Sequence, residues 1–306
     1  MINNIDPGNI NNEFDDTKST GERLLTGYYD KFSLEHLHRY GLAIKLANKV
    51  EVLDIACGEG YGSNLLASVA TKVYAVDIDK DTIERALKKY KAPNIDFITG
   101  SASQIPIPTA SVDLVVSFET LEHHDRHEEM YAEIKRVLRP NGILIISTPD
   151  KHFFSDITEH RNAYHVKELY FDEFESLNNR YFLNTLMFSQ KLHYGSLIIP
   201  HSTSNGCFSI LSGDHSKIQL CNSISEPTYH ICIASDNQIA DLGFSIFDGI
   251  EIIDSMEIKI SEQSLALSKL ESNFCALKKV KDDLEKSLAY RLGSLILWPF
   301  KLFIRA

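Results

Sequence analysis

The sequence predicts an α/β fold with a doubly wound, mainly parallel sheet of seven strands. Three observations predict it: short apolar runs alternate with helical segments, three closely spaced glycines follow the first run, and an aspartate ends the second. Alternation of this kind is typical of parallel sheets, whose strands are buried on both faces and are joined by crossover helices. The chain of 306 residues is long enough for one such domain and an appendage.

The expected strands occupy residues 50–56, 72–76, 95–98, 112–117 and 143–147, and the expected helices between them occupy residues 61–69, 80–90 and 127–138. A helix is expected near 166–177. Two more strands, near 182–190 and 229–234, are expected to close the sheet as an antiparallel hairpin. Residues 197–228 lie between those two strands and are rich in Ser and Asn, so they predict an insertion that can serve as a lid over the acceptor.

The chain divides into five predicted parts. Residues 1–20 are rich in Asn and predict a flexible arm, residues 21–236 form the α/β domain, and residues 237–255 form a linker. Residues 256–290 predict a coiled coil, since apolar residues repeat in two rows at heptad spacing, with a lone amphipathic helix as the alternative. The first row is Ile260, Leu267, Phe274 and Leu288, the second is Leu270, Leu277 and Leu284, and Gln263 and Lys281 interrupt the seam.

The last part, residues 291–306, places Trp298 and several other large apolar residues beside Arg291, Lys301 and Arg305. It is too short to span a bilayer and predicts either a membrane-associating tail or a segment that docks in an oligomer. Residues 255–306 hold nine basic and six acidic residues, whereas the whole chain has a net charge of −11. The acidic remainder argues against nucleic acid as a partner.

Cysteine usage and the start of the chain favour a cytoplasmic protein. The five cysteines show no metal-type pairing, and no signal peptide is visible. If the tail binds lipid, we expect the protein to be peripheral on the cytoplasmic face of the inner membrane.

A nucleotide-type cofactor site is predicted at the first strand-to-helix turn. Glycines at 58, 60 and 62 let the backbone approach a ligand. Asp77, nineteen residues after Gly58, ends the second strand and can accept hydrogen bonds from both ribose hydroxyls of an adenosine. The dinucleotide motif would need a glycine where this chain has Ser63, so the spacing argues against NAD.

This turn and four later segments resemble the motifs of class I S-adenosylmethionine-dependent methyltransferases. The segments are residues 52–62, 97–106, 111–119, Leu121-Glu122-His123 and 138–147. The resemblance implies S-adenosyl-L-methionine as the cofactor, and the residues that it assigns to cofactor binding are Asp54, Ala56, Gly58, Gly60, Tyr61, Asp77, Ile78, Ser101, Ala102 and Phe118. Many relatives place an acid where this chain has Ser101. Arg39, which precedes the first strand, is expected to lie on the cofactor carboxylate.

An acceptor hydroxyl must lose its proton as the new bond forms, so a base is expected near the methyl group. The resemblance makes His123 the first candidate, beside Glu122, and His165 a second one. A structural role, in which His123 ties its loop to backbone carbonyls, is the alternative. Further histidines at 124, 127 and 160 invite a metal interpretation, but their spacing fixes no third ligand, and no metal is predicted.

A closer resemblance, over about residues 20–235, is to bacterial methyltransferases of lipopolysaccharide O-antigen and other surface glycans, some of which carry C-terminal coiled coils. It rests on residues 21–23, 55–63, 117–123, 147–150 and 165–169. It implies O-methylation of a sugar in a surface polysaccharide, O-antigen or capsule, which in that family can cap the chain. The implied partners are a glycan or glycolipid acceptor, further copies of the chain, a glycosyltransferase or polymerase, and the inner-membrane surface.

Two other classes of protein stay open. One is a methyltransferase of quinones or other lipids or small molecules, which shares the fold and would show an apolar acceptor pocket. The other is a non-catalytic coiled-coil adaptor for glycan polymerisation machinery. The intact set of Asp54, Gly58, Gly60 and Asp77 argues against the adaptor.

Overall fold

The computed structural model of the chain describes residues 31–159, 162–193, 210–213, 218–221, 224, 226–240 and 242–293. The expected arm at 1–20, most of the insertion at 197–228 and residues 294–306 of the tail lie outside the described residues. The chain divides into two compact units, the first ending at Asp248 and the second beginning at Gly249.

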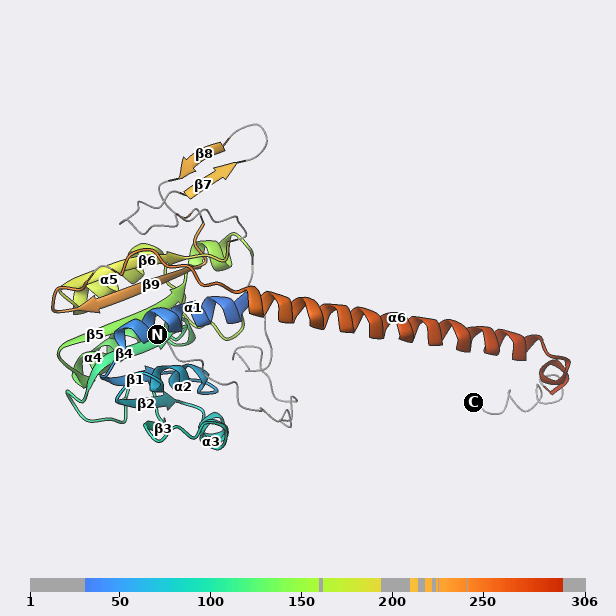
Figure 1. The fold of residues 1–306 in the computed structure, drawn as a ribbon, viewed down its shortest axis with the longest axis horizontal. Helices are drawn as coiled ribbons and strands as arrows, with labels where there is room; N and C mark the ends of the chain where they lie inside the picture. Colours follow the sequence, from blue (N-terminus) through green and yellow to red (C-terminus); the bar gives the residue numbers. More distant parts are fainter. Residues whose placement is uncertain are drawn as a thin grey trace. The chain divides into compact units, whose positions relative to one another are not determined.

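The first unit contains a seven-stranded sheet in the order β3-β2-β1-β4-β5-β9-β6 (Figure 1). The strands are β1 (Glu51–Ile55), β2 (Lys72–Asp77), β3 (Ile95–Thr99), β4 (Val112–Phe118), β5 (Leu138–Pro149), β6 (Asn184–Gln190) and β9 (Tyr229–Ser235). Strand β9 pairs antiparallel with both of its neighbours, and every other pair in this sheet is parallel. The predicted doubly wound sheet with its antiparallel closing pair is confirmed.

Helices cover both faces of this sheet. One face packs against α1 (Lys31–Leu46), α2 (Tyr61–Ala67) and α3 (Lys80–Lys89), which contribute Ala43, Leu66 and Ile83 to a buried core. The other face packs against α4 (His127–Val137) and α5 (Phe171–Tyr181) through Ile134 and Phe174. The sheet is therefore buried on both sides, as its continuous apolar strands require.

The helix expected at 166–177 begins later, at Phe171. The backbone N–H groups of Val166 and Lys167 donate to the carbonyl of Glu122, at 2.7 and 3.1 Å, so these residues form a turn against another loop. The side chain of Glu173 then accepts from the N–H of Tyr170 at 3.0 Å and caps the first turn of α5.

Three elements were not predicted from the sequence. They are helix α1 before the first strand, a π-helical segment η3 (Lys151–Asp156) after β5, and a two-stranded hairpin of β7 (Ile210–Gly213) and β8 (Ile218–Cys221) within the insertion. A π-helical segment is rare and has no pattern in the local sequence that would predict it.

The second unit contains α6 (Ile250–Lys286), a helix of 37 residues. It begins six residues before the predicted coiled coil and ends four residues before its predicted end, because Ser287 takes an extended conformation with ψ of 143°. Within the part of the chain that the structure describes, no helix has the length and apolar character needed to cross a bilayer.

Candidate active site

The glycine-rich turn lies at the carboxyl end of β1, where it leads into α2. Ala56, Gly58 and Gly60 all have positive φ, at 55°, 53° and 82°. A Cβ on Gly60 would lie 2.7 Å from the ring of Phe97, and a Cβ on Gly62 would lie 1.9 Å from the ring of Tyr40. The turn therefore needs glycine at these two positions for its tight course against the neighbouring aromatic rings.

Asp54, on β1, stabilises this turn through hydrogen bonds. Its carboxylate is 1% exposed and accepts hydrogen bonds from the hydroxyls of Ser63, at 2.6 Å, and Tyr40, at 3.2 Å. Burial raises the pKa of Asp54 to about 7, although both hydrogen bonds act against the rise. A buried acid with two fixed donors stabilises one conformation of the loop, and the assignment of Asp54 to cofactor binding stays a prediction.

Asp77, at the end of β2, faces the glycine turn. Its Oδ2 accepts from the backbone N–H of Gly58 at 2.9 Å, and its Oδ1 accepts from the N–H of Asp79 at 2.9 Å. The sequence predicts a contact of Asp77 with the ribose hydroxyls, and the structure shows that Asp77 also shapes the turn. Each carboxylate oxygen has a second lone pair for a ribose hydroxyl. The next residue, Ile78, is 73% exposed, which suits an apolar contact to an adenine ring.

The other residues predicted to bind the cofactor make different contacts within the protein. The hydroxyl of Ser101 accepts from the N–H of Ser103 at 3.2 Å and closes a local turn, and Ala102 packs against the core. Phe118 is 6% exposed and its ring lies 5.1 Å from that of Tyr40, so only its backbone remains for a ligand. The hydroxyl of Tyr61 lies 3.0 Å from Nδ1 of His36, which links the start of α2 to α1.

Arg39, on α1, has a fully buried guanidinium group. Its Nη1 donates to Oε1 of Gln190 at 2.8 Å and lies 3.7 Å from Oε1 of Glu119, and its Cζ lies 4.7 Å from the ring centre of Tyr229. Its Nε and Nη2 have no hydrogen-bond partner among the described residues. Burial raises the pKa of Tyr61 and the charge of Arg39 opposes that rise, so the guanidinium lies near the cofactor turn.

A buried cation with unpaired donors is costly, and an anion that accepts from Nε and Nη2 would remove the cost. The sequence places the cofactor carboxylate on Arg39, and that placement stays a prediction, as do the ribose contact of Asp77 and the adenine contact of Ile78.

We expect Arg39→Gln to weaken the binding of S-adenosylhomocysteine by roughly 10- to 100-fold, because one or two charge-assisted hydrogen bonds to the ligand carboxylate are lost. Isothermal titration calorimetry measures the change. Arg180→Gln serves as the matched control, since that side chain is 58% exposed and pairs with Glu128 at the surface. Equal affinity in the wild type and Arg39→Gln would remove Arg39 from the cofactor site.

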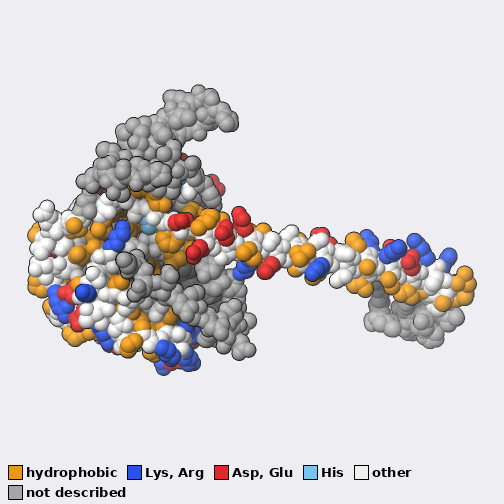
Figure 2. Space-filling model, viewed as in Figure 1, with side chains coloured by type: hydrophobic (Ala, Val, Ile, Leu, Met, Phe, Trp, Pro, Cys, Tyr) orange, Lys and Arg blue, Asp and Glu red, His pale blue; other side chains and the backbone are white. Residues whose placement is uncertain are grey.

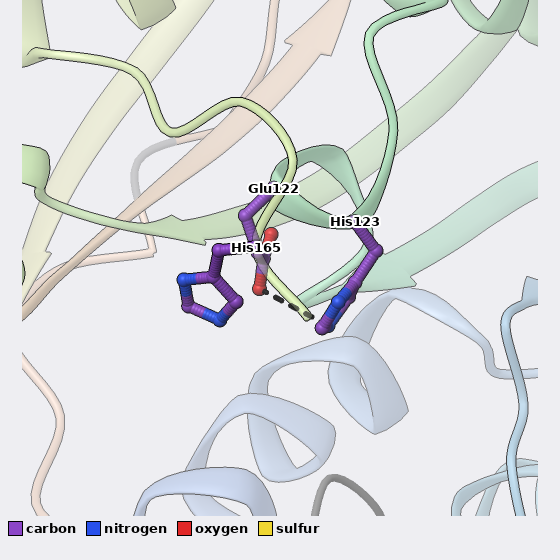
Figure 3. Close-up of side chains that lie close together, drawn as sticks. All are labelled: Glu122, His123 and His165. Carbon is purple, nitrogen blue, oxygen red and sulfur yellow. Dashed lines mark ion pairs between the residues drawn. The ribbon is translucent and has the colours of Figure 1, made fainter. Parts of the chain in front are cut away.

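Glu122, His123 and His165 lie together at the carboxyl end of the sheet (Figure 3). The first two come from a single 3-10 turn, η2 (Leu121–His123), and His165 comes from the loop before α5. One nitrogen or oxygen of each side chain lies within 4.8 Å of the other two. The structure thus brings the three predicted catalytic residues together, although His165 lies more than forty positions after the other two in the sequence.

Hydrogen bonds define the tautomers of the two histidines. Nδ1 of His123 lies 3.2 Å from the carbonyl oxygen of Tyr164, and a carbonyl only accepts, so this nitrogen carries the proton. In the neutral ring, the lone pair lies on Nε2, which is 3.9 Å from Oε1 of Glu122. Nδ1 of His165 is hydrogen-bonded to Oε1 of Glu168, and its ring stacks on that of Phe154.

Glu122 is 1% exposed, and its Oε2 accepts from the hydroxyl of Thr148 at 3.3 Å. Burial and the neighbouring Glu119 carboxylate raise the pKa of Glu122 well above its usual value, which favours its neutral form. Two imidazoles and one carboxylate, from His123, His165 and Glu122, are a donor set that transition metals bind. Sequence spacing alone does not group His165 with the other two.

The remaining histidines of this region serve local structure. His127 is buried and its Nε2 lies 2.8 Å from the carbonyl oxygen of Leu121, while Nδ1 of His124 accepts from the N–H of Arg126 at 3.1 Å. His160 lies outside the described residues. A shared helix face for His123 and His127 does not form, because they belong to different helices.

A cavity of about 760 Å³ adjoins the trio through His165. Its lining residues are Lys151, Ser155, Asp156, Glu159, Asn162, His165, Val166, Lys167 and Glu168. Eight of these nine side chains are polar or charged, and their aliphatic parts also line the cavity, so it offers hydrogen-bonding groups together with apolar surface.

Several supporting residues were missed in the sequence analysis. Tyr40 and Ser63 hold Asp54, Thr148 holds Glu122, and Gln190 and Tyr229 surround Arg39. The contact of Ser63 could have been predicted locally, because Ser63 lies in the first turn of α2, directly after the glycine turn, where its hydroxyl can reach Asp54. The other four reach the site through tertiary contacts and could not have been predicted in this way.

The comparisons with known proteins agree with this geometry. Residues 53–146 match the family described as "Methyltransferase domain". A "Probable S-adenosylmethionine-dependent methyltransferase" of Mycolicibacterium smegmatis is 36% identical over 154 residues, which cover 49% of this chain and 59% of the relative. A similarly named protein of Mycobacterium tuberculosis is 39% identical over 128 residues, 42% of this chain and 46% of the relative. The chain spans about half the length of these curated relatives.

A "Phthiotriol/phenolphthiotriol dimycocerosates methyltransferase" of Mycobacterium tuberculosis is 30% identical over 107 residues, 34% of this chain and 39% of the relative. The solved structure of a protein from Pyrococcus horikoshii has a TM-score of 0.50 and 19% identity, over 71% of this chain and 99% of that one. This last likeness supports the fold alone. The glycine turn thus lies in the region that matches the methyltransferase domain, and two of these relatives are named as probable S-adenosylmethionine-dependent methyltransferases.

Proposed function

We propose that this chain, by its domain a class I S-adenosylmethionine-dependent methyltransferase, methylates a sugar hydroxyl of a bacterial surface polysaccharide, such as O-antigen lipopolysaccharide or capsule. The cavity lined by His165 carries this proposal, because eight of its nine lining side chains can form hydrogen bonds with the hydroxyl groups of a glycan. On a terminal sugar, such a methyl group would also block the addition of the next sugar and end the chain.

The residues of the site divide the work between binding and proton transfer. S-adenosylmethionine, when bound, supplies a methyl group on a positively charged sulfur. Asp77 would accept the ribose hydroxyls, and Arg39 would pair with the carboxylate. Asp54 holds the glycine turn in the conformation that brings these groups together. These binding groups would align the methyl donor with the acceptor hydroxyl, and this alignment is the main requirement of an in-line methyl transfer.

Proton transfer is assigned to His123. Its ring is oriented by the carbonyl of Tyr164, so Nε2 presents a lone pair that can take the proton of an acceptor hydroxyl. His165, oriented by Glu168, would bind a neighbouring hydroxyl of the sugar, and Glu122 would fix the turn that carries His123. These roles need no metal.

Methyl transfer to purified surface polysaccharide, compared with transfer to a lipid and quinone extract, tests the proposal. We expect methylated sugar, detected by mass spectrometry of the hydrolysed glycan, and no methylated lipid. Methylation of the extract alone would contradict the glycan acceptor while leaving the methyltransferase assignment intact.

A lipid acceptor is the second candidate, and the relative named for phthiotriol and phenolphthiotriol dimycocerosates favours it. The same relative matches only 34% of this chain, so its acceptor region need not be shared. The two acceptor classes make opposite predictions in the assay above.

We also propose that α6 associates with further copies of the chain and that the tail binds the cytoplasmic face of the inner membrane, close to a glycosyltransferase or polymerase. The tail proposal rests on the sequence of residues 291–306, of which only the first three are described. We expect the protein to float with anionic vesicles and a truncation ending at residue 289 to remain in the soluble fraction. Equal behaviour of both proteins would reject the tail as an anchor.

A further inference from the structure

Helix α6 carries two rows of exposed apolar side chains. Ile260, Leu267 and Phe274 form the first row and are 59–68% exposed, and the second row is Leu270, Leu277 and Leu284 at 55–70%. The orange patches along α6 in Figure 2 include such side chains. A helix 37 residues long with two exposed apolar rows needs a partner to bury them. The seven-residue repeat of both rows fits another helix of the same kind.

Each row is interrupted once by a polar residue. Lys281 stands in the first row, seven residues after Phe274, and Gln263 stands in the second row, seven residues before Leu270. In a parallel pair in register, each residue of the seam faces its own copy. Two Lys281 ammonium groups would then meet inside the apolar seam, where like charges are strongly unfavourable.

In an antiparallel pair, the first row of one helix faces the second row of the other. If the pair is centred on residue 272, midway between 263 and 281, Gln263 faces Lys281 of the partner subunit. The other layers are then all apolar: Ile260 opposite Leu284, Leu267 opposite Leu277, and Leu270 opposite Phe274. In this register the two polar residues of the seam face each other. The amide oxygen of Gln263 can then accept a hydrogen bond from the ammonium group of Lys281 of the partner subunit.

The charge distribution along the helix favours the same orientation. Residues 250–271 contain five acidic and two basic residues, whereas residues 272–293 contain three acidic and five basic ones. Figure 2 shows acidic side chains along the first part of α6 and Lys and Arg side chains toward its end. An antiparallel pair places the acidic half of each helix beside the basic half of the other, and a parallel pair places like beside like.

We infer that α6 forms a two-stranded antiparallel coiled coil with α6 of a second copy of this chain, centred on residue 272. The pair has a two-fold axis perpendicular to the helices, so every layer occurs twice and the interface closes as a dimer. This inference rests on the self-association in the proposed function, and it is independent of the acceptor and of catalysis.

Disulfide trapping in the full-length chain tests the orientation and the register together. The background is Cys275→Ser, which removes the exposed cysteine of α6. The double variant Ile260→Cys/Leu284→Cys is expected to form a covalent dimer on mild oxidation, because the two positions face each other. The single variants Ile260→Cys and Leu284→Cys are expected to stay unlinked. Leu267→Cys/Leu284→Cys, which is out of register by one heptad, is the matched control and is also expected to stay unlinked.

Each outcome supports or overturns the proposed pairing of α6. Light scattering on the same samples gives the molecular mass as a second measurement. A single variant that links to itself overturns the antiparallel orientation in favour of a parallel one. Linking of the control pair instead of the predicted pair overturns the register. A monomeric mass for the wild type overturns the self-association itself, and a dimeric mass with no linked variant overturns the pairing proposed here. Binding of S-adenosylhomocysteine remains a separate measurement, so a failure here does not bear on the enzyme.

Discussion

His123→Gln is expected to lower kcat for the glycan acceptor by about 100-fold or more, with the affinity for S-adenosylhomocysteine unchanged. The glutamine keeps polar atoms in the turn but has no basic nitrogen, so the acceptor hydroxyl loses its proton acceptor. Steady-state kinetics gives kcat, and calorimetry gives the affinity. A purely structural role for the hydrogen bond between His123 and Tyr164 would instead lower the melting temperature and leave kcat of the folded fraction unchanged.

His152→Gln is the matched control, since His152 is exposed on η3 and does not belong to the trio. It is expected to keep full turnover. Retained turnover in His123→Gln would remove His123 from the role of base, and a loss confined to His165→Gln would transfer that role to His165. Loss of turnover in all three variants would point to damage of the cavity rather than to one base.

Asp77→Ala is expected to weaken S-adenosylhomocysteine binding by roughly 100-fold, because two hydrogen bonds to a charged acceptor are lost. The same substitution takes the acceptor from the N–H of Gly58, so the glycine turn loses part of its support as well. Calorimetry of the variant is expected to show no measurable heat at ligand concentrations that saturate the wild type.

Asp77→Asn separates the two effects, because an amide oxygen can still accept from Gly58 but carries no charge. We expect it to bind more weakly than the wild type and better than Asp77→Ala. Asp96→Ala, on β3 at the surface, controls for the loss of a carboxylate elsewhere in the sheet. Wild-type affinity in Asp77→Ala would mean that the cofactor lies elsewhere.

Local sequence patterns were sufficient for the strands and for the cofactor turn. Both rest on short-range rules: buried parallel strands read as apolar runs, and a turn that passes under aromatic rings needs glycine, as Gly60 and Gly62 do. The position of Asp77 follows from the same rules, since the carboxyl ends of adjacent parallel strands meet at one edge of the sheet.

The environment of the candidate catalytic and binding side chains did not follow from the sequence. Arg39 contacts Gln190, which is 151 positions away, and Glu122 meets His165 only because the loop before α5 turns back onto its carbonyl. That turn also explains why α5 begins at Phe171 rather than near 166. Contacts between distant segments set these features, and periodicity and propensity do not report on them.

The most direct test of the enzyme is a calorimetric titration of S-adenosylhomocysteine into the full-length wild type. The glycine turn, Asp77 and the free nitrogens of Arg39 predict binding with a dissociation constant in the micromolar range, about −8 kcal/mol. No binding by a protein that is folded by circular dichroism would contradict the cofactor site, and would favour the non-catalytic adaptor in its place.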